Sequence, residues 1–100
     1  DKIKMNQVEG FVGQLLSSAE SVFFAGEPSR STIKIYLPEG VNNITLTSSG
    51  VAVYLQTNNG EAIRFFDSKV ELNGTISNPE GLKKLVIYAK DNFVQITQLS

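Results

Sequence analysis

A chain of 100 residues with 41% apolar and 19% charged side chains has the composition of one globular domain. Nine basic and ten acidic residues give a formal net charge of −1, which excludes the positive field that draws proteins to nucleic acid or to an anionic membrane surface. The sequence has no histidine and no cysteine, so it excludes a Ser-His-Asp or Cys-His catalytic group, a disulfide, and a metal site built on imidazole or thiolate. We therefore expect no nucleic-acid partner, no cofactor and no metal.

The first predicted element is a long amphipathic helix over residues 3–24. Its apolar residues recur at intervals of three and four and form one stripe: Ile3, Val8, Phe11, Val12, Leu15, Leu16, Ala19, Val22 and Phe23. Gly26 stands where a C-terminal cap belongs, and Pro28 prevents the helix from continuing. At 1.5 Å per residue such a helix is about 33 Å long, which is long for so small a domain.

Small residues form a second line along this helix. Gly10, Gly13 and Ser17 are three and four residues apart, and each glycine costs on the order of 1 kcal/mol of helix stability relative to alanine. Two explanations are open. The line lies either against the domain's own sheet, where backbones pack closely, or against another helix outside the domain.

After Pro28 the apolar period changes to two, which predicts short β-strands. The segments are residues 31–38, 43–47, 51–57, 61–67, 69–72, 74–77, 82–90 and 93–99. Asn58-Asn59-Gly60 is a strong hairpin signal, and Asp91-Asn92 indicates a second hairpin. No helix connects the strands. We therefore expect an α+β fold, with the N-terminal helix packed on an antiparallel β-sheet or small β-sandwich of six to eight strands.

The chain resembles archaeal type IV pilin-like proteins, which are made with a class III signal peptide. The resemblance is carried by the end of the helix and the first strands, at Ala19, Val22, Gly26, Pro28, Ser29, Thr32, Pro38, Gly40 and Val41. Gly74 and Gly81, which precede the last hairpin, extend it. The resemblance implies a single pilin-like domain over residues 1–100, in which residues 1–26 are the C-terminal half of a long pilin helix and residues 29–100 are the β-domain.

The resemblance also implies a function. It predicts a non-catalytic structural subunit of a type IV pilus-like filament, or fimbrium, that serves in adhesion or as a surface appendage of the cell. Its partners would be other pilin subunits, contacted through an assembly helix that includes Ile3, Met5, Val8, Gly10, Phe11, Val12 and Gly13. The alternative is a membrane-tethered extracellular binding or adhesion module that does not polymerise.

One departure from the family lies at the start of the chain. Family precursors begin with a short basic leader, a cleavage site and about twenty apolar residues, and we expect such a segment upstream of Asp1 as the only contact with a membrane. A helix that continues into this segment should project beyond the sheet, because strands of five to seven residues span only about 17–24 Å. Ile3, Met5 and Val8 are then expected to be exposed.

Other polar residues fit known patterns less specifically. Asn43 and Asn73 each begin an Asn-x-Thr triplet, the acceptor pattern for N-glycosylation. Glu61, Asp67 and Glu71 fall on or beside neighbouring predicted strands and would form an acid/base pair only if the fold brought two of them together. Charged side chains that face solvent are the commoner explanation, so we expect no catalytic residue.

Overall fold

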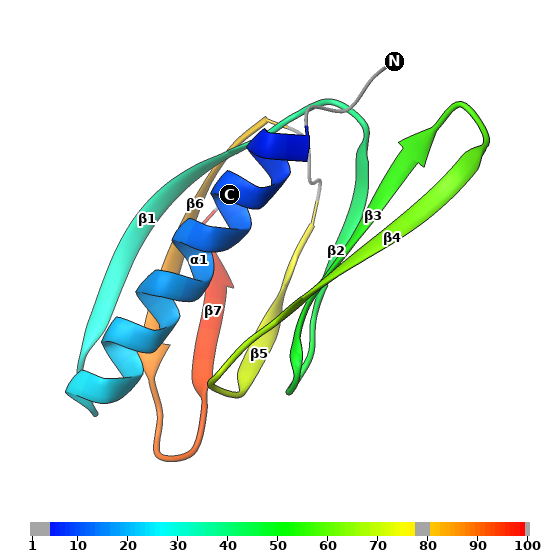
Figure 1. The fold of residues 1–100 in the computed structure, drawn as a ribbon. Helices are drawn as coiled ribbons and strands as arrows, with labels where there is room; N and C mark the ends of the chain where they lie inside the picture. Colours follow the sequence, from blue (N-terminus) through cyan, green and yellow to red (C-terminus); the bar gives the residue numbers. More distant parts are fainter. Residues whose placement is uncertain (1–4, 78–80, 100) are drawn as a thin grey trace.

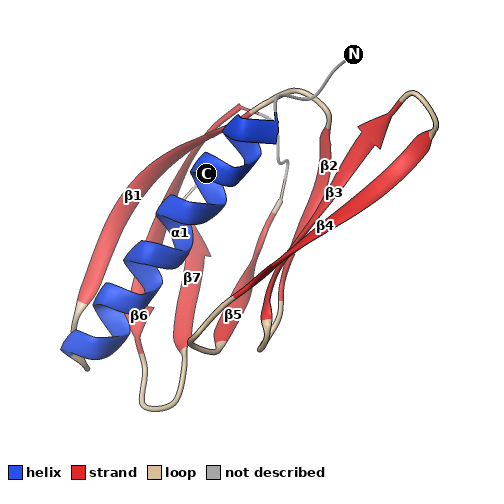
Figure 2. Cartoon of the chain, in the orientation of Figure 1, coloured by secondary structure: helices blue, strands red, loops and turns tan. Residues whose placement is uncertain are grey.

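One α-helix lies across one face of a seven-stranded β-sheet in the computed structural model, which describes residues 5–77 and 81–99 (Figure 1). The elements in chain order are α1 (Met5–Ala25), β1 (Arg30–Leu37), β2 (Val41–Leu46), β3 (Gly50–Thr57), β4 (Gly60–Asp67), β5 (Leu72–Ile76), β6 (Gly81–Ala89) and β7 (Val94–Gln98). Figure 2 shows the helix on one side of the sheet, with the other side of the sheet left open.

Helix α1 ends where the sequence predicts. Gly26 has a φ of 81°, and its N–H donates to the carbonyl oxygens of Val22 and Phe23, at 3.1 Å each. A left-handed glycine in this position satisfies carbonyl groups that the helix end leaves without a partner. The predicted cap is therefore confirmed. The predicted start of the helix at Ile3 lies outside the described residues.

The sheet is mixed, so the prediction of an antiparallel sheet or small sandwich is wrong. The strand order is β1-β6-β7-β5-β2-β3-β4, and β5 runs parallel to β7, with Leu72 beside Val94 and Gly74 beside Ile96. The other described pairings are antiparallel. A parallel pair needs a long crossover connection. Here β6 is part of that connection, because it comes between β5 and β7 in the chain and lies on the far side of β7, next to β1. The absence of a helical crossover in the sequence was therefore no guide to strand direction.

The hairpin signals give the local pairing correctly. β3 and β4 are joined at Asn58 and Asn59, and Gly60, with a φ of 112°, pairs with Thr57. β6 and β7 form the second predicted hairpin, with Ala89 beside Val94. The segments predicted at 69–72 and 74–77 correspond to a single strand, β5. Each hairpin is set by residues close in the sequence, which is why its signal is reliable.

The core lies between α1 and the inner face of the sheet. The helix contacts mainly β1 and β6, and then β7. Its buried residues are Val8, Phe11, Val12, Leu15, Ala19 and Val22. On the strands, buried side chains such as Ile33, Ile35, Leu85, Ile87 and Ile96 face them and belong to the same cluster. Burial of one helix stripe against one sheet face is the arrangement that a two-layer domain needs.

Candidate functional site

The first half of α1 does not project beyond the sheet. Val8, Phe11 and Val12 are 0%, 5% and 1% exposed, and Met5 is half-buried against the core. The predicted exposure of Val8 is therefore wrong, and Ile3 lies outside the described residues. The reason is one of length. Strand β6 has 9 residues and spans about 30 Å, and the 21 residues of α1 span about 32 Å, so the helix is about as long as this strand and its stripe is buried from Val8 to Val22.

The outer face of α1 carries a line of small and uncharged residues. We name it the outer stripe, and it consists of Asn6, Gly10, Gly13, Ser17, Ser21 and Phe24. Successive members are three or four residues apart, so they lie on one face of the helix. All are exposed, and Phe24 is 74% exposed. The predicted assembly residues thus separate into two groups: Gly10 and Gly13 lie on the surface, whereas Val8, Phe11 and Val12 lie in the core.

The two glycines have open space around them. A Cβ added at Gly10 or Gly13 would meet no atom within 4 Å, apart from the neighbouring helix backbone. Close packing on the domain's own sheet, one of the two explanations left open by the sequence, therefore does not account for them within the described residues.

Helix α1 has few charged residues near the outer stripe. Between Met5 and Ala25 the charged residues are Glu9 and Glu20. The Glu9 carboxylate lies 3.6 Å from the guanidinium of Arg64 on β4, which in turn lies over the ring of Phe66, 5.3 Å from its centre. Both partners of the ion pair are about half exposed, so the pair contributes little to stability. The outer stripe itself is a neutral surface.

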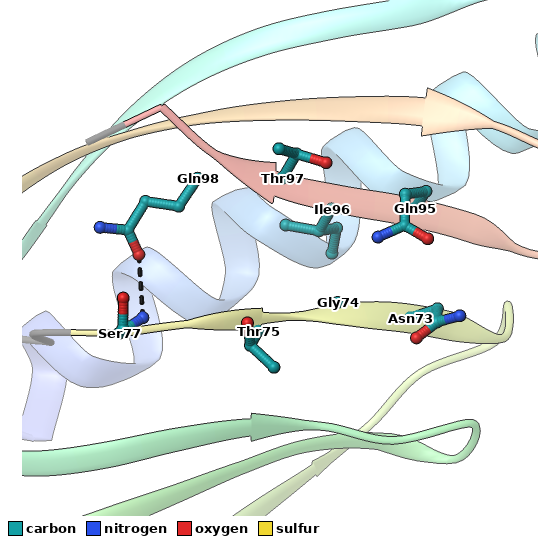
Figure 3. A pocket seen from close by; sticks show the side chains of 8 residues that line it. All are labelled: Asn73, Gly74, Thr75, Ser77, Gln95, Ile96, Thr97 and Gln98. Atoms are coloured by element: carbon teal, nitrogen blue, oxygen red, sulfur yellow. Dashed lines mark hydrogen bonds between the residues drawn. The ribbon is translucent and has the colours of Figure 1, made fainter.

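A second feature is a polar groove on the open face of the sheet, between β5 and β7 (Figure 3). The groove has a volume of about 380 Å³ and is lined by Asn73, Gly74, Thr75, Ser77, Gln95, Ile96, Thr97 and Gln98. It lies where the pairing of β5 with β7 ends, because this pairing runs only from Leu72 to Gly74. Beyond this point Ser77 donates its backbone N–H to the Gln98 side-chain oxygen, at 2.9 Å, in place of a strand-to-strand bond.

The groove offers hydrogen-bonding groups without charge. Among the described residues, the side chains of Asn73, Thr75, Gln95 and Thr97 make no hydrogen bond to another part of the chain. Amides and hydroxyls both donate and accept, so they match ligands with neutral hydroxyl groups.

The two N-glycosylation triplets lie side by side on the open face. Thr45 of the first triplet is directly opposite Thr75 of the second, across strands β2 and β5. Asn43 and Asn73 are both exposed. The Asn43 side-chain oxygen accepts the backbone N–H of Ile44 at 2.9 Å. Both asparagines are thus accessible, and Asn73 also borders the groove.

Two of the three carboxylates named from the sequence lie far apart in the fold. Glu61 and Asp67 lie six residues apart on β4, a separation of about 20 Å along a strand. Glu71 lies in the connection before β5. No group of His, Cys, Asp or Glu able to hold a metal occurs within residues 5–77 and 81–99.

The sequence analysis missed part of the outer stripe and all of the polar groove. Ser21 and Phe24 continue the spacing of Gly10, Gly13 and Ser17, so a helical projection of the whole segment would have found them. The groove had no such signal. Its residues come from two strands that are distant in the sequence, and their neighbourhood depends on the parallel pairing.

No family model, no curated protein and no solved structure matches this chain. Of the helical segments in the described residues, none has the length and hydropathy required to cross a membrane.

Proposed function

We propose that the chain is a non-catalytic structural subunit of a type IV pilus-like filament at an archaeal cell surface, the class of protein that its sequence resembles. The single observation that supports this best is the outer stripe. Gly10 and Gly13 each weaken the helix by about 1 kcal/mol relative to alanine, and neither makes room for another part of the described chain. Contact with a helix outside the domain gives both residues a role.

The partner in this proposal is the helix of another copy or of a related subunit. Small residues at intervals of three and four allow two helix backbones to approach closely. The members of the stripe are uncharged, and within the described helix only Glu9 and Glu20 carry charge beside them at helical spacing, so such a contact desolvates few ionised groups. Phe24, at the end of the stripe, would bury its exposed ring in the same contact. A membrane contact is proposed only for a segment upstream of Asp1, and the β-domain would coat the outside of the filament.

Substitution of the stripe glycines should have opposite effects on the domain and on the filament. Gly10→Ala and Gly13→Ala are expected to stabilise the isolated domain by up to about 1 kcal/mol each, because alanine is the better helix former and the sites have open space. Chemical denaturation measures this. In cells that produce the protein, Gly13→Leu should abolish the filaments seen by electron microscopy, because leucine holds the helices apart.

The matched control is Gln7→Leu, which adds an exposed leucine to α1 outside the outer stripe. Filaments should persist in this variant. Normal filaments with Gly13→Leu, or a loss of stability with both alanine variants, would contradict the assembly role of the stripe.

The groove favours a second candidate, the membrane-tethered binding or adhesion module. Its uncharged amide and hydroxyl groups suit a neutral carbohydrate. If this candidate is correct, Gln95→Ala and Thr75→Val should lower the retention of the domain on immobilised neutral glycans, and Gly13→Leu should leave the retention unchanged. If instead no glycan is retained while filaments depend on Gly13, the tethered module is excluded.

A further inference from the structure

The two outermost strands of the sheet, β1 and β4, lie on opposite flanks of the molecule (Figure 1). Each has 8 residues. A strand at the edge of a sheet has N–H and C=O groups that point outward without a partner strand, so it can add a strand from another chain.

The hydrogen bonds of the sheet show which residues point outward. Ala89 donates its N–H to the carbonyl oxygen of Ser29, at 2.9 Å, so Ser29 and Ala89 are a hydrogen-bonded pair at the end of the β1–β6 ladder. Ser68 donates its backbone N–H to the carbonyl oxygen of Ser49, also at 2.9 Å, so these two residues are a hydrogen-bonded pair at the end of the β3–β4 ladder. Bonded residues alternate along an antiparallel strand. The outward residues are therefore Arg30, Thr32, Lys34 and Tyr36 on β1, and Glu61, Ile63, Phe65 and Asp67 on β4.

These two sets of side chains are complementary. On β1 they alternate with residues that face the core. On β4 they alternate with Arg64, which pairs with Glu9 of α1, and with Phe66, which packs against the core, so both sets lie on the open face of the sheet. The β1 set carries two basic residues, Arg30 and Lys34, whereas the β4 set carries two acidic residues, Glu61 and Asp67. Both sets also expose large apolar groups: Tyr36 is 62% and Ile63 is 58% exposed.

The direction of the strands also fits. Following the pairings from β1 to β4 through the sheet shows that these two strands run antiparallel to each other. When a second copy continues the same sheet, its β4 therefore meets β1 of the first copy as an antiparallel neighbour.

We propose that the β1 edge of one copy pairs with the β4 edge of the next, so that the sheet continues from molecule to molecule. The pairing that overlaps both strands fully places Arg30 opposite Asp67. It also places Thr32 opposite Phe65, Lys34 opposite Ile63, and Tyr36 opposite Glu61. In this register every outward N–H and C=O group meets an outward group of the other strand.

A head-to-tail pairing is favoured over pairing of identical edges. Two β1 edges would bring Arg30 and Lys34 of both copies together, and like charges across an interface oppose binding. The head-to-tail contact leaves one β1 and one β4 edge free at the two ends of the assembly. It therefore produces an open chain of molecules instead of a closed dimer.

One contact within the domain competes with this pairing. The Gln14 side chain of α1 donates to the Lys34 carbonyl oxygen at 3.3 Å, and this oxygen is one of the outward acceptors of β1. Gln14 must turn away before Ile63 of the next copy can donate to the same oxygen. Edge pairing is therefore weak in solution, and Gln14→Ala should strengthen it.

The decisive experiment uses proline to block one edge at a time. Thr32→Pro removes an outward N–H of β1, and Ile63→Pro removes an outward N–H of β4. Proline is tolerated at such positions because neither N–H bonds to the domain's own sheet. Thr32→Val and Ile63→Thr keep the N–H and serve as controls. Sedimentation velocity measures the mass of each protein up to millimolar concentration, and circular dichroism checks that each is folded.

Wild-type protein and both controls should form species that grow with concentration beyond the dimer. Thr32→Pro alone and Ile63→Pro alone should remain monomeric. An equimolar mixture of the two should form a heterodimer and nothing larger, because only one free β4 edge and one free β1 edge can meet. A monomeric wild-type protein, or dimers of either proline variant alone, would overturn the proposal.

Charge reversal provides a second test if a proline variant does not fold. Arg30→Glu and Asp67→Lys should each weaken association about two- to fivefold, as expected for one exposed ion pair, and an equimolar mixture should recover it. Absence of this recovery would overturn the edge register. The inference does not rest on the helix contact proposed above. All these variants leave the outer stripe unchanged, so a negative result with them would contradict edge pairing and not the helix contact. Normal filaments with Gly13→Leu would likewise contradict the helix contact and not edge pairing.

Discussion

Replacing Leu15 with alanine is expected to lower the free energy of unfolding by about 2–5 kcal/mol, the range for a buried leucine. Leu15 is 0% exposed and lies on the inner face of α1, in the cluster that joins the helix to the sheet. A domain of this size has a total stability of only about 5–15 kcal/mol. The variant should therefore lose a large share of its stability and should melt at a markedly lower temperature.

Leu16→Ala is the matched control, because the same atoms are removed from the next residue, which is only half-buried. Its cost should be clearly smaller than that of Leu15→Ala. Urea denaturation of both variants measures the difference. If Leu15→Ala costs less than about 0.5 kcal/mol, the value typical of exposed sites, the helix does not pack on the sheet as described.

Gly74→Ala is expected to destabilise the domain by at least about 1–3 kcal/mol, the cost of a strained backbone conformation. Gly74 has a φ of 131°, which side chains rarely adopt. In addition, a Cβ there would overlap the carbonyl oxygen of Ile96 on β7. The parallel β5–β7 contact therefore depends on the absence of a side chain, and alanine should push the two strands apart at the groove.

Gly60→Ala separates the two causes. Gly60 has a similar φ of 112°, but a Cβ there would meet nothing within 4 Å. Its cost should come from the backbone conformation alone and should be smaller. Equal losses of stability for the two variants would show that β5 and β7 do not approach each other as closely as the structure has them. This would contradict the parallel β5–β7 pair that makes the sheet mixed.

The sequence predicts the local features of this fold. The stripe from Val8 to Val22 repeats at helical spacing and forms the buried face of α1. The cap at Gly26 and the hairpin at Asn58 and Asn59 are set by the conformations of a few neighbouring residues. Interactions over such short distances leave their signal in the sequence.

Long-range features were predicted less well. Period-two patterns identify strands without identifying their neighbours, so nothing in residues 72–76 revealed that β5 lies between β2 and β7. The burial of Val8 was missed because the projection of the helix was argued from strands of five to seven residues, whereas β6 has 9. The continuous apolar stripe through Val8 and Leu15 had already indicated one buried face.

The same difference between local and long-range features applies to the candidate site. Gly10 and Gly13 stood out in the sequence because glycine is costly in a helix, but the sequence left open which way they face. Their exposure in the fold removes one of the two explanations. The groove and the complementary sheet edges depend on strand order and hydrogen-bond phase, which only the fold supplies.

Cross-linking between copies tests the central claim, assembly through the outer stripe, most directly. These 100 residues contain no cysteine, so Ser17→Cys introduces the only thiol among them and places it on the stripe. Thr57→Cys, beside the turn between β3 and β4, is the control away from the helix. Both variants would be oxidised in intact cells that produce the protein, and surface material would be separated by non-reducing electrophoresis. The account predicts cross-linked subunits from Ser17→Cys and none from Thr57→Cys. Filaments that contain Ser17→Cys subunits without any cross-link between them would contradict it.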